Sequence, residues 1–556
     1  MSREDWRGSI LEVRLGPPGH GGFCVARHEG RVLFVRHGLP GELVRARVTE
    51  DRGGSFCRAD AVEILEPSAD RIDPTCPVSG PGGAGCCDFA HASPEGQRAL
   101  KATVVSEQLR RLADWEPDFE VEVIPAPVYG AAAPLLPATG SAAGARPGAV
   151  GGVRGSAAIR VRGAVAAYGE DAEAARAGAT APGRGSGLAA GRVKGIAAGR
   201  VRDFISGPGD DAGIGRGAPI LGGPEFGSPD RPSGVIAPQS YTAGWRSRVR
   251  LVVDADGRAG VHRYRSTDVI ADLRCPQPMA GAMEGIADRK WTPGADLVVA
   301  VDGDGMRHLI ELAPVESERG GRQDRGRAGR GGDRRGGRQG GGHGGDRSST
   351  AARRAAASGP RAERVIDGSG RTVQYVSGRR FELSATGFWQ PHYGAAQRYS
   401  DVVAEWSDAA SDALAWDLYS GVGVFAARLA EQVGAGGAVH GVEFARTAVT
   451  EGKAALRDLP WVELRAERVE RWIVEQPATA PDVVVLDPPR AGAGKEVVAA
   501  LAERGPRRIV HIGCDPAAFA RDLGLYRSAG YNPAGLRVFD AFPGTHHVEC
   551  IAVLER

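Results

Sequence analysis

The sequence of 556 residues is long enough for several domains, but part of it lacks the apolar residues that a packed core needs. Glycine accounts for 82 residues and aromatic residues for only 6%, and this bias is concentrated in two stretches rich in Ala, Gly and Arg. The formal net charge of +2 excludes a strongly basic chain, although arginines cluster locally. The sequence has no run of about 18 apolar residues and no apolar signal-peptide core at its N-terminus, so we expect a cytoplasmic protein with reduced cysteines and no membrane partner.

Residues 1–66 predict a small β-barrel of the OB type. Short runs in which apolar and polar residues alternate, such as ILEVRL, FCVARH and RVLFVR, are separated by Gly and Pro turns. The polar face of this barrel either contacts RNA or is simply solvated. Its expected arginines are Arg14, Arg27, Arg31, Arg36, Arg45 and Arg47.

Three further segments, residues 67–126, 236–316 and 362–385, are assigned to a small, β-rich central domain. The first carries a cysteine cluster and then a long helix, PEGQRALKATVVSEQLRRLADW, in which apolar residues recur at helical spacing and a proline lies at the start. In the second, Asp256 and Gly257 separate two alternating runs and predict a β-hairpin.

Two segments are too low in complexity to pack. Residues 127–235 consist largely of Ala, Gly, Pro and Arg without a fixed repeat, and we interpret them as a disordered insert. Residues 317–361 form an Arg/Gly-rich linker. Such tracts bind single-stranded nucleic acid without sequence preference, but a solvated linker without a partner explains this composition equally well.

Residues 386–556 predict an α/β domain with a mostly parallel sheet. The strand-like runs LAWDLYS, AVHGVEF, PDVVVLDPPR and RRIVHIGCDP are interspersed with helical segments, and GLRVFDAFPGTHHVECIAVLER predicts two closing strands. In such a sheet, ligands bind at the carboxyl ends of the strands. The functional residues are therefore expected where these strands end.

A Gly-rich turn follows the first of these strands. Gly421 and Gly423 let the backbone approach a ligand closely, and Glu443 lies 22 positions after Gly421, near the spacing at which an acid binds ribose hydroxyls. These residues indicate an adenosine-containing ligand, but they do not distinguish NAD from S-adenosylmethionine. Asp487 and the two prolines after it form a rigid turn related to one with which amino-group methyltransferases hold a flipped base, and this favours the methyl donor.

Two further residues are candidates for reaction chemistry. Cys514 ends the RRIVHI strand just before Asp515 and Pro516, which suit the N-cap and first turn of a helix, and the partial positive charge there favours a thiolate. Glu549 lies within the apolar run VECIAVL, where an unpaired charge is costly. A buried packing role for Cys514 and a structural ion pair for Glu549 are the alternatives.

Taken together, these residues resemble those of the RNA uracil-5-methyltransferase family, whose members act on ribosomal or transfer RNA. The resemblance covers residues 9–126, 236–316 and 362–556, and it rests above all on Cys514 and on the run FPGTHHVE that ends at Glu549. It implies a Rossmann-like class I methyltransferase domain, an N-terminal TRAM domain that binds RNA, and S-adenosylmethionine as the methyl donor.

The resemblance also implies roles for individual residues. Cys514 matches the catalytic nucleophile of the family and Glu549 matches the catalytic base. The positions that match cofactor-binding residues are Gln390 (in FWQPH), Tyr419, Glu443 and Asp487. The sequence departs from the family at Val424, where an Asn is frequent, and at Asp515, because the nucleophile is usually followed by Asn-Pro.

These roles imply methyl transfer to C5 of a uridine through a covalent intermediate. Addition of the Cys514 thiolate at C6 makes C5 nucleophilic, and Glu549 later removes the C5 proton so that the thiolate can leave. The uridine has to be unpaired or flipped out to reach such a site. The expected partner is ribosomal or transfer RNA, and the protein is expected to be a monomer.

Some members of the family hold a [4Fe-4S] cluster with four cysteines. Cys76, Cys87 and Cys275 fit that pattern, but Ala84 occupies the position of one ligand. A cubane cluster needs four ligands, and Cys86 would have to substitute beside its own neighbour. We therefore expect no cluster and no other metal.

Two other functions remain open. An exocyclic-amino nucleic-acid methyltransferase would use the turn after Asp487 but would need neither Cys514 nor Glu549. A non-catalytic RNA-binding protein could retain the fold and use the barrel and the Arg/Gly tract. Binding of S-adenosylmethionine without turnover would favour the second of these.

Overall fold

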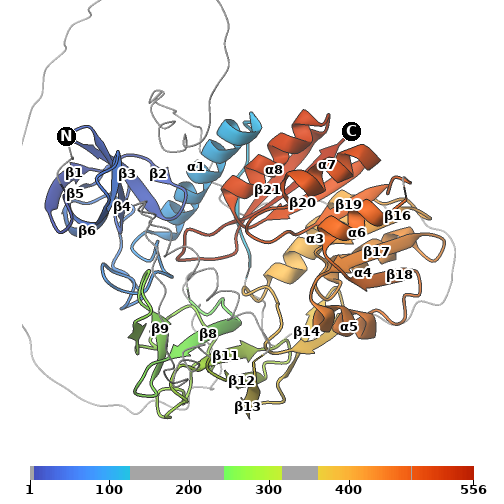
Figure 1. Ribbon diagram of the computed structural model, residues 1–556, viewed down its shortest axis with the longest axis horizontal. Helices are drawn as coiled ribbons and strands as arrows, with labels where there is room; N and C mark the ends of the chain where they lie inside the picture. The colour runs from blue at the N-terminus through green and yellow to red at the C-terminus, as the bar shows by residue number, and fades with distance from the viewer. Residues whose placement is uncertain (1–4, 126–242, 316–360, 478) are drawn as a thin grey trace, which may run out of the picture. The chain divides into compact units, whose positions relative to one another are not determined.

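The computed structural model describes residues 5–125, 243–315, 361–477 and 479–556, which belong to one compact unit. Three larger sheets and one hairpin organise these residues (Figure 1). The insert predicted at 127–235 lies outside the described residues, as does nearly all of the linker predicted at 317–361. Within the described ranges, no helix combines the length and the apolar character needed to cross a membrane.

The N-terminal sheet has the strand order β1-β5-β6-β4-β3-β2. Alternation along the strands buries Val44, Ala46 and Val48 while Arg45 and Arg47 between them face solvent, as the period of two requires. β1 also contacts β3, so the sheet curls on itself as a barrel does. The strands are β1 (Ile10–Arg14), β2 (Pro18–Gly19), β3 (Phe23–His28), β4 (Arg31–Arg36), β5 (Leu43–Asp51) and β6 (Phe56–Glu66).

Two of the six arginines expected on the exposed face of the barrel are buried. Arg31 is 3% exposed and donates to both carboxylate oxygens of Asp51, and Arg36 is 6% exposed and donates to Asp88 at 2.6 Å. The prediction was wrong for these two, because a buried carboxylate partner offsets the cost of removing a guanidinium from water. The other four are exposed: Arg14, Arg27, Arg45 and Arg47.

The central sheet is antiparallel, with the order β10-β9-β8-β11-β12-β13. The predicted hairpin is confirmed, since β8 pairs with β9 around Gly257. Gly257 has a φ of +75°, and a Cβ there would lie 2.8 Å from the Trp291 carbonyl oxygen, so only glycine fits. The strands are β8 (Arg248–Val253), β9 (Ala259–His262), β10 (Val269–Ile270), β11 (Asp296–Val301), β12 (Arg307–Leu312) and β13 (Glu363–Asp367), followed by the separate hairpin β14 (Arg371–Val376) and β15 (Arg379–Ser384).

The third sheet has eight strands in the order β18-β17-β16-β19-β20-β22-β21-β7. Strands β16 to β20 pair in parallel, and β22 lies antiparallel between β20 and β21. Every residue of β19 is buried, as expected for a central strand that is covered on both faces. The strands are β7 (Val121–Val123), β16 (Leu414–Leu418), β17 (Ala438–Glu443), β18 (Val462–Ala466), β19 (Val483–Leu486), β20 (Arg508–Gly513), β21 (Asn532–Asp540) and β22 (Glu549–Glu555).

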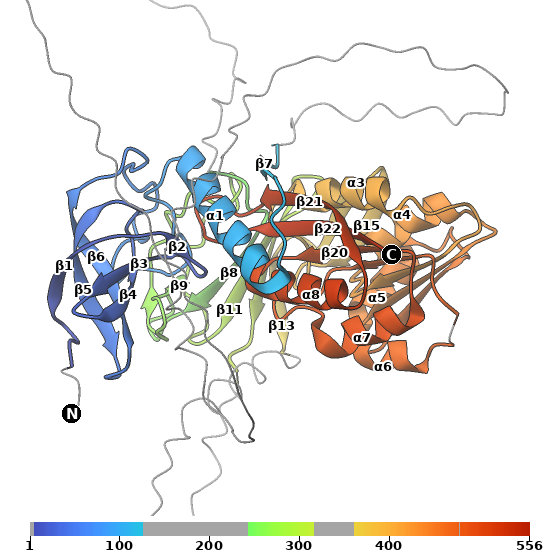
Figure 2. The same cartoon turned by 90° about the horizontal axis from the view of Figure 1, so that it is seen from above.

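Helices cover both faces of this sheet and form two hydrophobic cores (Figure 2). One face is packed by α3 (Ala395–Ser407), α4 (Val424–Val433) and α5 (Arg446–Ala455). The other is packed by α1 (Pro94–Ala113), α6 (Val469–Glu475), α7 (Gly494–Arg504) and α8 (Pro516–Ser528). This arrangement is the doubly covered, mostly parallel α/β sheet that the sequence predicts.

Helix α1 packs against α8, and β7 extends the eight-stranded sheet by pairing with β21. These residues were predicted to belong with the central segments, because helical periodicity locates a helix but does not identify its partner. Polar side chains of α1 also bond to the end of β21 and to the loop that follows it. Lys101 is 1% exposed and donates to Oδ1 of Asp540 at 2.5 Å and to the Phe542 carbonyl at 3.1 Å, while Oε1 of Gln97 accepts the Gly544 N–H at 2.7 Å.

We expect Lys101→Met to lower the free energy of unfolding by about 3–5 kcal/mol, because it leaves the buried Asp540 carboxylate without its cation. Arg98→Ala on the same helix removes a more exposed pair with Glu95 and should cost only about 0.2–1 kcal/mol. Urea denaturation of the two variants measures both. Equal losses would show that the buried pair does not anchor α1.

Candidate active site

The register of the parallel strands brings the predicted site residues to one edge of the sheet. A single row of paired residues crosses four strands, β17, β16, β19 and β20, and consists of Val442, Leu418, Leu486 and His511. Each of the first three is followed directly by a predicted cofactor residue, namely Glu443, Tyr419 or Asp487. Two residues separate Cys514 from His511. Glu443, Tyr419, Asp487 and Cys514 therefore all lie at the carboxyl ends of neighbouring strands.

The Gly-rich turn after β16 is held by Glu443. Oε2 of Glu443 accepts the N–H of Gly421 at 3.2 Å, and Oε1 accepts the N–H of Ala445 at 2.7 Å. Behind the turn, Oδ2 of the fully buried Asp417 accepts the N–H of Ala426 in the first turn of α4 at 2.8 Å. Oδ1 of Asp417 is buried and has no hydrogen-bond partner within the described residues. An unpaired buried oxygen beside a Gly-rich turn is what a polar ligand in this turn would satisfy.

Tyr419 lies at the start of this turn, directly after β16. Tyr419 has a φ of +64°, unusual for a residue with a side chain, and its hydroxyl contacts Glu470 at 3.5 Å. Burial and the Glu470 carboxylate raise the pKa of its phenol. Gln390 is half-buried in the segment between β15 and α3, which precedes the strands of this sheet edge in the sequence.

Cys514 and Glu549 lie at facing ends of two adjacent strands. The pairing of β20 with β22 ends at Gly513 and Cys550, so Cys514 and Glu549 are the next residues on the two strands. Glu549 is 3% exposed, and it forms no ion pair within the part of the chain that the structure describes. The structural ion pair considered as an alternative therefore has no partner among these residues.

Helix α8 begins directly after Cys514. Oδ1 of Asp515 accepts the N–H groups of Ala517 at 3.1 Å and of Ala518 at 2.9 Å, and Pro516 occupies the first helical position. The predicted N-cap is confirmed. Cys514 thus sits at the junction of a buried strand and a capped helix.

The three acidic groups at this edge influence one another. Burial raises the pKa of Asp487 to about 7. Burial also raises the pKa of Glu549 well above its ordinary value, and the Asp487 charge adds to this rise. Burial, together with the charges of Glu549 and Asp487, raises the pKa of the Cys514 thiol to about 12, and Arg490 opposes this rise. The ligand-free site is thus electrostatically unfavourable for further negative charge and suited to a cation.

The loop between β21 and β22 adds residues that the sequence analysis did not single out. Nδ1 of His546 lies 2.5 Å from Oδ2 of Asp88, and Nε2 of His547 lies 3.2 Å from the Arg490 guanidinium. The alternation of strands and helices gives no indication of these contacts, because Asp88 comes from the segment before α1.

Comparison with known proteins gives matches at both ends of the chain and over its whole length. The family model for the TRAM domain matches residues 6–62, and the model for tRNA (uracil-5-)-methyltransferase matches residues 468–556. A protein of Streptomyces avermitilis described as an uncharacterized RNA methyltransferase is 34% identical over 99% of this chain and 98% of its own. One of Corynebacterium diphtheriae, described in the same way, is 31% identical over 99% of this chain and 97% of its own. The chain belongs to the RNA uracil-5-methyltransferase family.

The fold has a solved counterpart. The crystal structure of the Pyrococcus abyssi tRNA (uracil-54, C5)-methyltransferase in complex with S-adenosyl-L-homocysteine is similar with a TM-score of 0.53 and 16% identity, covering 98% of this chain and 100% of that one. The predicted fold class is confirmed: an N-terminal TRAM domain is combined with a Rossmann-like methyltransferase domain. The protein is an S-adenosylmethionine-dependent RNA methyltransferase.

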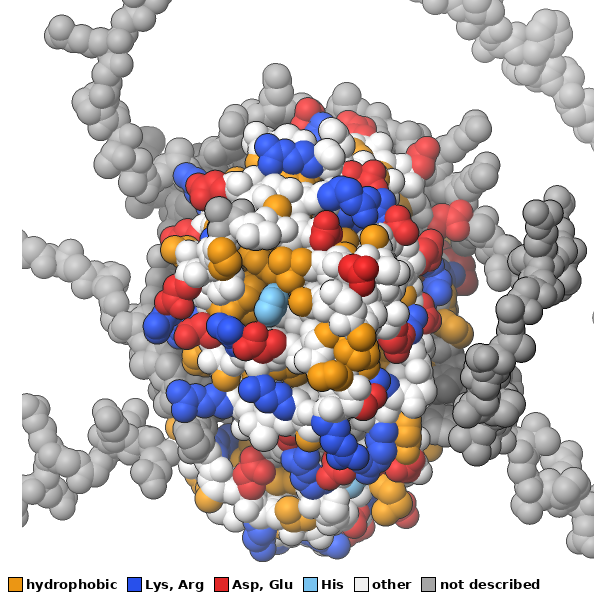
Figure 3. Space-filling view, turned by 90° about the vertical axis from the view of Figure 1, so that its right-hand side faces the viewer, with side chains coloured by type: hydrophobic (Ala, Val, Ile, Leu, Met, Phe, Trp, Pro, Cys, Tyr) orange, Lys and Arg blue, Asp and Glu red, His pale blue; other side chains and the backbone are white. Residues whose placement is uncertain are grey.

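One face of this methyltransferase mixes charges of both signs. On the face drawn in Figure 3, Lys and Arg side chains are interspersed with Asp and Glu, and hydrophobic side chains gather between them. This distribution agrees with a net charge of only +2. RNA binding by this protein therefore does not follow from net charge, and it has to depend on local surfaces.

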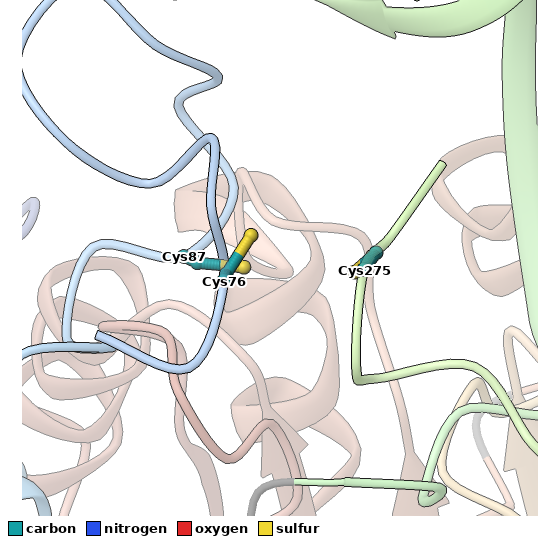
Figure 4. Close-up of side chains that lie close together, drawn as sticks. All are labelled: Cys76, Cys87 and Cys275. Carbon is teal, nitrogen blue, oxygen red and sulfur yellow. The ribbon is translucent and has the colours of Figure 1, made fainter. Parts of the chain in front are cut away.

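The structure brings together three of the cysteines that fit the cluster pattern of the family (Figure 4). The ligand atoms of Cys76, Cys87 and Cys275 lie within 4.8 Å of one another, and Nε2 of Gln277 donates to Sγ of Cys87 at 3.4 Å. A fourth thiol, that of Cys86, lies 3.9 Å from Cys87. The fourth family position is held by the buried methyl group of Ala84, so the cubane ligand set is incomplete there and three thiolates alone do not fill it.

We expect the protein, purified without oxygen, to contain little iron, because Ala84 supplies no ligand. Metal analysis of the full chain measures this. A coloured protein with about four irons per chain would contradict the expectation. Loss of that iron in Cys86→Ser, but not in Cys24→Ser in the barrel, would then identify Cys86 as the substitute ligand.

A second prediction concerns pH. Below a pKa of about 7 the Asp487 carboxyl is protonated, and above it the group is a carboxylate that favours a nearby cation. S-adenosylmethionine carries a sulfonium charge that S-adenosylhomocysteine lacks. We therefore expect the ratio of their affinities to rise in favour of the sulfonium between pH 6 and pH 8, by at most about ten-fold per pH unit.

Calorimetric titration with each ligand at both pH values measures that ratio. Asp487→Asn should weaken S-adenosylmethionine binding and remove the pH dependence of the ratio, because the amide does not ionise. A cofactor role for Asp487 would be contradicted if the affinity ratio of the two ligands in the wild-type protein did not change with pH. It would also be contradicted if Asp487→Asn bound S-adenosylmethionine as tightly as the wild type.

Proposed function

We propose that this methyltransferase transfers a methyl group from S-adenosylmethionine to C5 of a uridine in ribosomal or transfer RNA through a covalent bond between Cys514 and C6. The observation that carries the proposal is the juxtaposition of Cys514 and Glu549 at facing ends of β20 and β22, at the sheet edge that holds Asp487. Amino-group methylation requires neither a thiol nor a second buried base at this position.

We assign the cofactor to the Gly-rich turn, with Gln390, Tyr419, Glu443 and Asp487 as its binding residues. The unpaired oxygen of Asp417 and the hydrogen bonds that fix Glu443 on the turn support this assignment. When bound, S-adenosylmethionine supplies an electrophilic methyl group. The residues of the chain hold the reacting uracil and move its proton.

The reaction begins with Cys514. Its thiolate forms a bond to C6 of uracil, and the electrons of the C5–C6 double bond move toward O4, which makes C5 a nucleophile. The raised pKa of this thiol in the free protein means that ionisation has to accompany ligand binding. Arg490, on the turn after Asp487, is the group that favours the thiolate.

The reaction ends with Glu549. Once C5 carries the methyl group, its remaining proton passes to the Glu549 carboxylate, the C5–C6 double bond re-forms and the thiolate leaves C6. Burial raises the pKa of Glu549, which makes its carboxylate a stronger base than an exposed one. The lack of an ion pair among the described residues leaves the carboxylate available.

The comparisons support the choice of uracil at the level of the family. The model that matches residues 468–556 describes tRNA (uracil-5-)-methyltransferases, and this segment contains both Cys514 and Glu549. The choice between ribosomal and transfer RNA remains part of the proposal. Mass-spectrometric mapping of 5-methyluridine in both RNAs, from cells with and without the gene, would decide it.

We expect two variants to fail in different ways. Cys514→Ala cannot add to C6, so it should form neither product nor a covalent RNA complex. Glu549→Gln should add and methylate but then stall, because the C5 proton stays and elimination is blocked. The stalled protein–RNA adduct should survive denaturing gel electrophoresis, with the methyl group from labelled S-adenosylmethionine in the shifted band.

The substrates for this test are unmodified transcripts of ribosomal and transfer RNAs. Cys550→Ala is a matched control, because this neighbouring thiol is buried in β22 and has no role in the proposal. A folded Glu549→Gln protein that binds the RNA but forms no adduct would contradict the covalent mechanism. If Cys514→Ala retains methylation, the exocyclic-amino alternative is favoured instead.

A further inference from the structure

The turn between β2 and β3, residues 20–22, lies beside the residue that follows Cys514 and beside the loop that leads to Glu549. This turn belongs to the TRAM domain, for which the proposed mechanism requires only RNA binding. Nε2 of His20 lies 3.1 Å from Oδ2 of Asp515, the residue directly after Cys514. Both side chains are about one-third exposed, so the contact lies at the border of solvent and interior.

The two oxygens of Asp515 have separate partners. Oδ1 accepts the two N–H groups at the start of α8, and Oδ2 contacts His20. A carboxylate that is fixed at both oxygens cannot rotate about its last bond without losing one of them. His20 and the helix N-terminus together therefore fix the side chain of Asp515, and this limits the motion of the adjoining Cys514 peptide.

The same turn also contacts the loop that leads to Glu549. Gly22 has a φ of +78°, and a Cβ there would lie 3.0 Å from Cβ of Asp88 and 3.1 Å from Nδ1 of His546. Asp88 accepts from Arg36 of β4 through Oδ1 and contacts His546 through Oδ2. The barrel thus reaches the Cys514 strand through His20 and the Glu549 loop through Gly22 and Asp88.

We propose that the turn at residues 20–22 forms one side of the active site and that His20 is a positioning residue that orients Cys514 through Asp515. The proposal rests on the proposed function, because it assigns His20 to the step in which Cys514 adds to C6. The TRAM domain then has two roles: it binds RNA, and it sets the geometry of the nucleophile. A small displacement of a reacting group is enough to slow a step strongly.

The test isolates the addition step. In the Glu549→Gln background, which accumulates the adduct, the single-turnover rate of adduct formation is measured with unmodified ribosomal and transfer RNA transcripts. We expect His20→Ala to lower this rate by about ten-fold. His20→Gln, whose amide retains an N–H donor, should restore most of the rate. RNA affinity should change by less than about two-fold, because the step affected follows binding.

The matched control is His28→Ala, a histidine of the same barrel whose carboxylate contact is with Glu29. It should leave the adduct rate unchanged. Asp515→Asn retains an oxygen that can cap α8, and His20→Ala combined with Asp515→Asn should be no slower than the slower single variant if the two residues act as a unit. Additive losses would contradict the proposal.

Other outcomes also decide the matter. A His20→Ala variant with weaker RNA affinity and an unchanged rate at saturating RNA would make His20 an RNA contact and overturn the proposal. If His20→Ala and His20→Gln both lose activity and both melt at a lower temperature, the role of His20 is structural. This outcome would also overturn the proposal. If the Glu549→Gln parent itself forms no adduct, the proposed function fails, which is distinguishable from failure at His20.

Discussion

The buried ion pair between Lys101 and Asp540 joins helix α1 to β21, the strand before the loop that leads to Glu549. Lys101 projects from α1 and also donates to the Phe542 carbonyl, while Gln97, one turn earlier, accepts the N–H of Gly544. Phe89 donates its N–H to the Gly544 carbonyl as well. The loop that ends at Glu549 is therefore fixed by residues that precede it by more than four hundred positions. Burial lowers the pKa of Lys101, and the charge and hydrogen bond of Asp540 oppose this, so the charged form of Lys101 depends on Asp540.

This constraint explains why the sheet edge can hold several acidic groups. Burial raises the pKa values of Asp417, Asp487 and Glu549, and the Asp487 charge adds to the rise at Asp417 and at Glu549. Such an arrangement disfavours the folded state unless the surrounding backbone is held firmly. Two layers of helices, the antiparallel strand β22 and the anchored loop provide that support. The electrostatic cost is concentrated where a cationic cofactor is expected to bind.

Much of the fold could be predicted from periodicity and turn residues, because these are local properties of the chain. The buried runs that became β16, β17, β19 and β20, the hairpin at Gly257 and the cap at Asp515 all follow from neighbouring residues. Long-range pairings could not be predicted in this way. Arg31 and Arg36 have the spacing of exposed barrel residues, and only the distant carboxylates of Asp51 and Asp88 explain their burial.

The same limit applies to the site. Glu443, Asp487 and Cys514 could be proposed as site residues because each directly follows or ends a strand of the sheet, a pattern that a single sequence displays. His20, Asp88 and His546 could not, since their importance lies in contacts between segments that are far apart in sequence. A histidine in a polar turn has no local signature that separates an isolated surface residue from one that contacts the residue beside Cys514.

The anchoring of α1 has a consequence for synthesis of the protein on the ribosome. Lys101 precedes Asp540 by 439 residues. At translation rates of about 5–20 residues per second, its partner emerges roughly 20 to 90 seconds later. During this interval α1 has no α8 to cover its apolar face, and β7 has no β21 with which to pair. The nascent chain therefore carries an unfinished interface during this interval, and the loop before Glu549 is anchored only after β21 has left the exit tunnel.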